Sequence, residues 1–277
     1  MTVEVAVAAE NQLGEGVIWS PQLSRVLWAD IPGKSMWSFD PATNSRTKTD
    51  LGERLSAVVM LSRSKMLVAF ASGLAFVDLD TGKRTEITKI EPDMPATRLN
   101  DAKLDRQGRF IVFSQDVGGG EFYQLHRLDL AEGKTTLLTD GRSRNGNAHF
   151  SHDGRWLFHN STRRNGRDTD VWRLDPLRPE SAEMILQVSG GGWAVLDVQD
   201  DGSRVLLQNR RSITDSELHL LEVSTRKLSK LTPAHERVVS YASARFSRDG
   251  RSVFATTDLD SEFLRLVRID AATGNLV

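Results

Sequence analysis

The 277-residue sequence contains no cysteine. Disulfide bonds, thiol nucleophiles and thiolate metal sites are therefore excluded, and a reducing compartment fits, so we expect a cytoplasmic protein. Residues 1–4 lack the basic and then apolar character that begins a secretory signal. No apolar run approaches the roughly 20 residues that a membrane-spanning helix needs.

An excess of charge of one sign is also lacking. Lys and Arg number 36 against 37 Asp and Glu, which gives a formal net charge of −1. Nucleic acids and anionic membrane surfaces attract proteins that carry a basic field or stripe, and this sequence has neither. We therefore expect no nucleic-acid partner and no membrane partner.

Helical periodicity is the third feature that the sequence lacks. Its apolar residues alternate in short runs that Gly, Asp, Asn and Pro interrupt, a pattern typical of an all-β protein. A strand that ends in an acidic residue, followed by a turn rich in Thr, Gly or Asn, recurs at intervals of about 40–50 residues, the period of propeller blades. The six acidic residues are Asp40, Asp78, Asp129, Asp175, Glu222 and Asp270.

A second repeated signature is an Asp-Gly turn between two apolar strands. It occurs at Asp153-Gly154, Asp201-Gly202 and Asp249-Gly250, and in a looser form at Asp105 to Gly108. Asp and Gly both tolerate the positive φ of a tight hairpin, so we interpret these aspartates as structural residues rather than catalytic carboxylates. Each repeat then contains four antiparallel strands, as a propeller blade does.

The repeats predict a single six-bladed β-propeller domain over residues 1–277, with an irregular β-sandwich as the alternative. The sixth repeat ends too soon for a fourth strand, so we expect the alternating segment at residues 2–9 to join the last blade and close the ring. We expect a monomer, whose central channel could take a small molecule or an ion. The predicted blades cover about residues 10–52, 53–92, 97–139, 145–188, 192–232 and 238–277.

Three segments carry a resemblance to a known family. They are Leu13-Gly14-Glu15-Gly16-Val17-Ile18-Trp19, Leu27-Trp28-Ala29-Asp30-Ile31, and residues 98–110, which begin Arg98-Leu99-Asn100-Asp101. In this order and spacing they resemble the senescence-marker-protein, gluconolactonase and luciferin-regenerating family over about residues 1–112. The resemblance implies a six-bladed propeller with metal-dependent lactonase activity. Val17 and Ile111 depart from the family's usual Pro and Trp.

From about residue 114 to residue 277 the sequence resembles the propeller of prolyl-oligopeptidase-class peptidases. Residues 161–172, 192–197 and 258–266 carry this second resemblance. The change would fall inside the third blade, near residues 111–114, whereas natural fusions usually join at exposed linkers. We therefore interpret the chain as an engineered hybrid, with a natural propeller whose blades diverged unevenly as the alternative. No Gly-x-Ser-x-Gly elbow is present, so peptidase chemistry is not expected.

The lactonase resemblance implies a metal in the central channel, held by oxygen ligands from several blades. Glu15 matches the family's glutamate ligand, and Arg98 and Asn100 match positions that contact the substrate. In blade four the ligand position falls on Gly146, and the equivalent stretch in blade five, which ends at Ala194, has no carboxylate. An incomplete shell of this kind predicts at most a weakly bound divalent cation such as Ca²⁺.

The function that these observations favour is that of an engineered, chimeric scaffold without catalytic activity and without a catalytic residue. The alternative is a divalent-metal-dependent lactonase with an altered metal shell. A third hypothesis is that the protein is an interaction module, because propellers present a flat face and a channel mouth to partners.

Overall fold

The computed structural model of this chain describes residues 5–89, 102–105, 107–116 and 120–277. These residues form 23 strands and no helix, which confirms the prediction of an all-β protein. Consequently no helix in the described part of the chain is long and apolar enough to cross a membrane.

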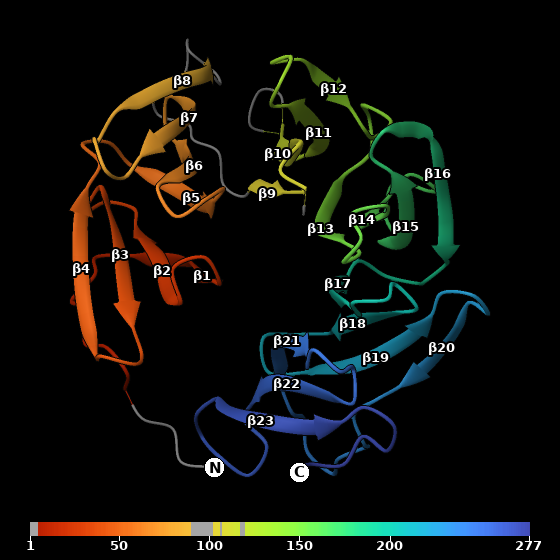
Figure 1. Cartoon of the computed structure of the whole chain (residues 1–277). Coiled ribbons are helices and arrows are strands. Elements are labelled where there is room, and N and C mark those ends of the chain that lie inside the picture. Colours follow the sequence, from red (N-terminus) through yellow and green to blue (C-terminus); the bar gives the residue numbers. More distant parts are fainter. Residues whose placement is uncertain (1–4, 90–101, 106, 117–119) are drawn as a thin grey trace. The chain divides into compact units, whose positions relative to one another are not determined.

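The strands form six successive antiparallel sheets, in which strands adjacent in the sequence pair with one another (Figure 1). The first sheet contains β1 (Gly14–Ser20), β2 (Arg25–Asp30), β3 (Ser35–Asp40) and β4 (Ser45–Asp50). The second contains β5 (Leu55–Met60), β6 (Lys65–Phe70), β7 (Gly73–Asp78) and β8 (Arg84–Lys89). The third contains β9 (Ala102–Leu104), β10 (Phe110–Gln115), β11 (Gln124–Asp129) and β12 (Thr135–Leu137).

The last three sheets repeat this arrangement. The fourth contains β13 (Asn145–Phe150), β14 (Leu157–Ser161), β15 (Asp170–Asp175) and β16 (Arg178–Leu186). The fifth contains β17 (Trp193–Val198), β18 (Arg204–Arg210), β19 (Ser216–Glu222) and β20 (Lys227–Lys230). The sixth contains β21 (Tyr241–Phe246), β22 (Ser252–Thr257) and β23 (Arg265–Asp270).

Six such sheets in succession are the blades of a six-bladed β-propeller, so the predicted fold class is confirmed. The chain forms two compact units, of which one contains Glu4–Gln115 together with Arg127–Thr136. The other contains Asp116–His126 and Leu137–Val277. The assignment of all 277 residues to one domain stays a prediction.

The acidic residues of the first repeated signature stabilise the turn that follows the third strand of a blade. Asp78 Oδ1 accepts hydrogen bonds from the backbone N of Thr81 at 2.8 Å and from its Oγ1 at 2.7 Å. Asp270 makes the same two contacts with Thr273. The next residue in the first of these turns, Gly82, has a φ of 70°, which glycine adopts without strain.

The Asp-Gly turns have the structural role that we predicted. Asp153 Oδ1 accepts hydrogen bonds from Ser151 Oγ at 2.6 Å and from the backbone N of Arg155 at 3.0 Å. Gly154 between them has a φ of 68°. These carboxylates are occupied by the turn and are not available for catalysis.

The predicted pairing of residues 2–9 with the last blade is not seen among the described residues. Residues 5–8 belong to no strand, and residues 2–4 lie outside the described part of the chain. Beside β23, Leu276 forms an isolated bridge with Ile269, and the backbone N of Val277 donates to Arg268 O at 2.9 Å. The C-terminal residues therefore occupy backbone groups of β23 that the prediction assigned to the N-terminal strand.

The third blade is one sheet across the predicted junction at residues 111–114. β10 runs through these residues and pairs with β9, with Ile111 opposite Leu104. Ile111 is fully buried and packs with Leu67 and Leu74 of the second blade and with Leu128 of its own. Apolar side chains between neighbouring sheets form the core in this way throughout each unit.

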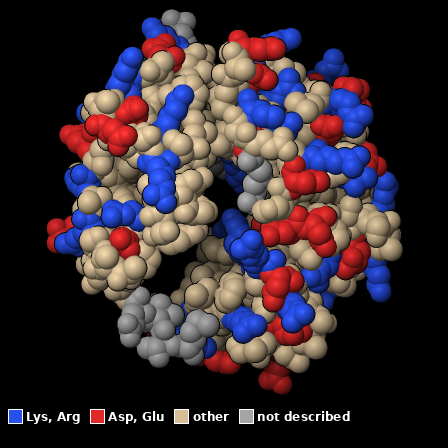
Figure 2. Space-filling view, viewed as in Figure 1, with Lys and Arg blue, Asp and Glu red and all other residues tan. Residues whose placement is uncertain are grey.

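Charged side chains of both signs are interspersed on the surface face shown in Figure 2. This distribution accords with the net charge of −1. The expected absence of a nucleic-acid or membrane partner, and the monomeric state, stay predictions.

Candidate active site

Glu15 lies on an irregular part of β1, at the start of the first blade. It pairs with Ala29 of β2, and the register shifts between Glu15 and Ile18. Gly16, at the bulge, has a φ of 66°, a left-handed conformation that favours glycine. The bulge leaves the Glu15 side chain exposed.

The strand that carries Glu15 is anchored by Asp30 in β2. The buried Asp30 carboxylate accepts a hydrogen bond from the backbone N of Leu13 at 3.2 Å. Burial acts to raise the pKa of Asp30, but hydrogen bonds from Leu13 and Asn11 outweigh it, so the pKa lies below its usual value. A Cβ at Gly33 would collide with the carboxylate of Asp30, so any larger residue here would displace that side chain. Asp30 thus positions Glu15 without being free to bind a ligand.

The same bulge occurs in the first strands of two other blades. In β13 the register shifts between Gly146 and His149, and in β21 between Ala242 and Arg245. Asn147 and Ser243, which correspond to Gly16, have φ values of 52° and 51°. The residues that correspond to Glu15 are therefore Gly146 and Ala242.

The fifth blade has a shorter bulge, between Val195 and Asp197 of β17. Counting from its hairpin, the residue that corresponds to Glu15 is Ala194, which pairs with Gln208 as Glu15 pairs with Ala29. The strand register thus supports the sequence alignment at both Gly146 and Ala194. Neither residue offers an oxygen from its side chain.

A divalent ion bound as the lactonase resemblance implies would need several oxygen ligands, partly from carboxylates. In the part of the chain that the structure describes, no group of three or more His, Asp or Glu side chains could hold an ion. Glu15 has glycine and alanine at the corresponding positions of blades four, five and six. The described residues therefore do not fit such an ion.

The two predicted substrate contacts, Arg98 and Asn100, lie outside the described residues. The described part of the third blade resumes at β9, where Lys103 pairs with Val112 of β10. Asp105, at the end of β9, is buried and accepts a hydrogen bond from Arg109 Nε at 2.9 Å. It has the structural role that its turn predicted.

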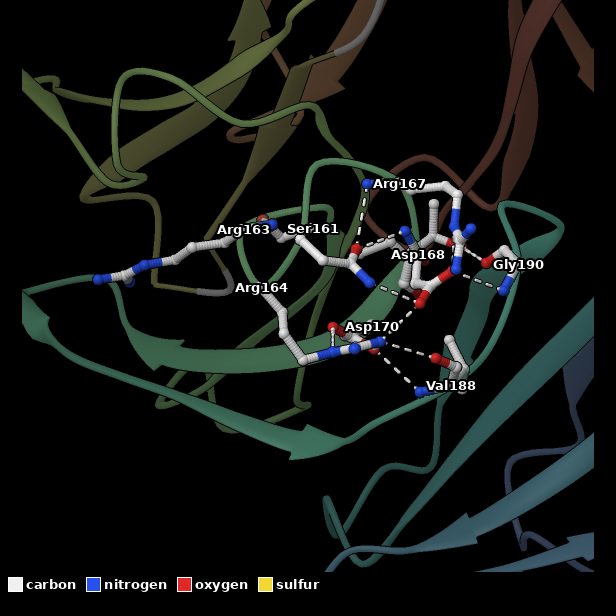
Figure 3. A network of polar contacts seen from close by, with 11 residues as sticks. Ser161, Arg163, Arg164, Arg167, Asp168, Asp170, Val188 and Gly190 are labelled. Atoms are coloured by element: carbon white, nitrogen blue, oxygen red, sulfur yellow. Dashed lines mark hydrogen bonds and ion pairs between the residues drawn. The ribbon is translucent and has the colours of Figure 1, made fainter.

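Residues 161–172 form a network of polar contacts in the fourth blade (Figure 3). Arg164 Nε donates to Asp170 Oδ2 at 2.8 Å, and its Nη2 donates to Asp168 Oδ2 at 2.8 Å and to Val188 O at 2.9 Å. The backbone N of Gly190 donates to Asp168 Oδ1 at 2.9 Å. This network holds the loop between β14 and β15 against the connection to the fifth blade. The polar residues of this segment therefore have a structural role.

Sequence reasoning missed a polar pocket in the fifth blade. It is lined by residues of β19, β20 and the connection that precedes β21. These residues are up to 30 positions apart, from Arg211 to Tyr241. No local motif unites them, so only the fold reveals their proximity.

Residues 13–176 match the model of a family described as SMP-30/Gluconolactonase/LRE-like region. The L-arabinolactonase of Azospirillum brasilense is 35% identical over 123 residues, which are 42% of this chain and 41% of that protein. The 6-deoxy-6-sulfogluconolactonase of Pseudomonas putida is 28% identical over 165 residues, 58% of this chain and 55% of that protein. The chain thus spans about half the length of these curated relatives.

A solved structure of a calcium-binding protein, regucalcin from Agrobacterium tumefaciens, has a similar fold. Its TM-score is 0.61 and its sequence identity 19%, over 91% of this chain and 84% of that one. Identity at this level supports the fold and says nothing of what this chain binds.

These matches correct the interpretation of the chain as an engineered hybrid. The family match runs without a break through residues 111–114, where the junction was predicted, and ends at residue 176 in the fourth blade. Nothing in the comparisons supports a prolyl-oligopeptidase origin of residues 114–277. The favoured function, a scaffold without catalytic activity, is also wrong, because the curated relatives are named lactonases.

Proposed function

Because this chain belongs to the SMP-30/gluconolactonase/LRE-like family, we propose that it hydrolyses sugar lactones. The observation that carries the proposal is the family match over residues 13–176, which includes Glu15 on its bulge. The relatives that match part of this chain are named for lactones of arabinose and of a sulfonated gluconic acid. A lactone of a pentose or hexose acid is therefore the substrate class that we propose.

Lactone hydrolysis adds water to the ring carbonyl and breaks the bond between the carbonyl carbon and the ring oxygen. One proton leaves the attacking water, and one reaches the departing ring oxygen. A carboxylate can carry out both transfers if it lies within hydrogen-bond distance of the water. We assign this role to Glu15, whose side chain is exposed.

Arg98 and Asn100 remain the proposed substrate contacts. A guanidinium and an amide can donate to the carbonyl oxygen and to the hydroxyls of a sugar lactone. The described residues do not fit a divalent ion, so the proposed reaction assigns no step to one. Cytoplasmic localisation likewise stays a prediction from the sequence.

The test is hydrolysis of L-arabino-1,4-lactone, followed by proton release, with the full chain and with its Glu15→Gln variant. We expect Glu15→Gln to lower kcat/KM by at least about 100-fold, since general-base catalysis typically contributes that much. Glu10→Gln is the matched control, because Glu10 is also exposed and lies five residues earlier. A rate no faster than spontaneous hydrolysis would contradict the proposal, and an equal rate in Glu15→Gln would contradict the role of Glu15.

A further inference from the structure

A polar pocket of about 230 Å³ lies at one end of the fifth blade, within a single compact unit. One wall comes from the hairpin between β18 and β19 and from the facing ends of β19 and β20. The other comes from the connection between β20 and β21. The side chains that characterise the pocket are those of Arg211, Asp215, Glu217, Lys230, His235 and Tyr241.

The first wall is a ladder of ion pairs. Arg211 donates through Nε and Nη2 to the two carboxylate oxygens of Asp215, both at 2.7 Å. Its Nη2 also lies 3.0 Å from Glu217 Oε1, which accepts a second hydrogen bond from Lys230 Nζ at 2.7 Å. The hydrogen bond from Arg211, assisted by Lys230, lowers the pKa of Glu217 to about 2. Two cations thus face two carboxylates, and the wall has no net charge at neutral pH.

The second wall and the floor are held rigidly. His235 Nε2 and the hydroxyl of Tyr241 are 2.8 Å apart, and their rings stack with centroids 6.0 Å apart. Ser216 Oγ accepts from the backbone N of Tyr241 at 2.7 Å and donates to its O at 2.8 Å. Tyr241 is only 2% exposed, whereas His235 is half-buried and borders the pocket. These hydrogen bonds hold His235 and Tyr241 in place, so this side of the pocket is fixed by the fold.

We propose that this pocket binds a neutral, polyhydroxylated molecule of the size of a monosaccharide. Sugar hydroxyls both donate and accept, and the first wall offers donors in Arg211 and Lys230 beside acceptors in Asp215 and Glu217. The charges of these four residues balance, and the two other charged residues of the lining, Glu236 and Arg237, are also of opposite sign. Neither an anion nor a cation therefore gains a net attraction. The volume is smaller than the roughly 300 Å³ of the smallest pockets for drug-sized ligands, which suits a ligand with about a dozen non-hydrogen atoms. Glu15 is not among the residues that line this pocket, and the proposal does not depend on the proposed lactonase activity.

The probes are D-glucose, D-gluconate and D-glucosamine, three six-carbon compounds that are neutral, anionic and cationic. Binding to the full chain is measured by saturation-transfer NMR. We expect D-glucose to bind with a Kd on the order of 1 mM, as befits a ligand of this size, and each charged compound to bind no more tightly. Absence of saturation transfer to D-glucose, or a tenfold preference for D-gluconate, overturns the proposal.

Variants locate the binding site. Arg211→Gln with Lys230→Met leaves two uncompensated carboxylates, so we expect D-glucose to bind about tenfold more weakly and D-glucosamine to become the preferred probe. Lys227→Met, on the same strand as Lys230, is the matched control and should keep the wild-type Kd. If the double variant does not fold, as judged by circular dichroism, His235→Ala replaces it with the same expected loss for D-glucose. An unchanged Kd in the folded variant overturns the proposal, as does loss of binding in Glu15→Gln, which would place the sugar at the lactonase site.

Discussion

The carboxylate of Asp197 in β17 accepts a hydrogen bond from the backbone N of Phe246 in β21, with 2.8 Å between Oδ2 and N. In the opposite direction, Arg245 Nη1 donates to the backbone O of Leu196 at 2.6 Å. The first strands of the fifth and sixth blades are therefore joined by polar side chains as well as by the core between them. Burial has the largest effect on the pKa of Asp197 and raises it, although the hydrogen bond from Phe246 and the charge of Arg245 oppose this.

Two substitutions of Asp197 should distinguish the contribution of its hydrogen bond to stability from the contribution of its charge. Asp197→Ala leaves the amide of Phe246 without its partner, and we expect it to lower the free energy of unfolding by about 1 kcal/mol at pH 7. Asp197→Asn should cost less, because its amide oxygen can still accept and no charge is desolvated. Urea unfolding at pH 7 measures both, and an Asn variant less stable than the Ala variant would contradict this account.

The pH dependence of the same residue has a definite sign. Since the folded-state pKa of Asp197 is raised, its contribution to stability is fully present below the unfolded-state value and is lost as pH rises through the folded-state value. Asp197→Asn should remove this component. The difference in unfolding free energy between wild type and Asp197→Asn should therefore favour the wild type more at pH 3 than at pH 7.

The repeated turns made the fold predictable from the sequence. Contacts between residues that are far apart in the sequence could not be predicted in this way. Asp78 and Asp153 bind backbone groups within three residues of themselves, so their roles can be seen in a short stretch of sequence. Leu276 forms a bridge with Ile269 at the edge of β23, where the N-terminal strand was predicted to pair. The sequence pattern alone does not show which of two segments pairs with a given strand edge. The segment around Arg164 led to a wrong interpretation for a different reason. Its distinctive sequence was taken as evidence of a prolyl-oligopeptidase-class origin, whereas its polar residues hold a loop in place.

His159 makes the fold sensitive to acid. It is 3% exposed in β14, and its Nε2 has no hydrogen-bond partner among the described residues. Burial lowers its pKa from 6.5 to about 4. Between these two pH values the imidazole is protonated in the unfolded chain but not in the folded chain. The free energy of unfolding therefore decreases as pH falls from about 6.5 towards about 4.

The size of this loss follows from the shift. It corresponds to on the order of 3 kcal/mol at the acid end, at 1.36 kcal/mol for each unit of pKa. We expect His159→Gln to flatten the dependence of the urea midpoint on pH over this range. His152→Gln is the control, because His152 is half-exposed in a turn. A wild-type midpoint that does not change between pH 6.5 and 4 would count against the buried neutral imidazole.

The network around Arg164 should be structural. Arg164→Met removes the partner of the buried Asp170 carboxylate, and breaking a buried ion pair from one side is strongly destabilising. We expect the Tm to fall by several degrees, with no effect on lactone hydrolysis at a temperature where the variant is folded. Arg167→Met is the control, since the Arg167 side chain is 81% exposed and its ion pair should contribute little. Equal melting temperatures for the two variants would refute the structural role.

Removal of divalent cations tests the ligand set around Glu15. The corresponding positions in blades four and five are Gly146 and Ala194, so the described residues offer one carboxylate where a hard cation needs several oxygens. An ion held by so few ligands would exchange freely and contribute little to folding. We therefore expect EDTA, followed by dialysis, to change neither the Tm nor the rate of lactone hydrolysis. Elemental analysis before and after dialysis shows whether an ion was removed. Retention of one equivalent of Ca²⁺ together with a lower Tm after EDTA would mean that other oxygens complete the shell, and Glu15→Gln would then be expected to abolish that retention.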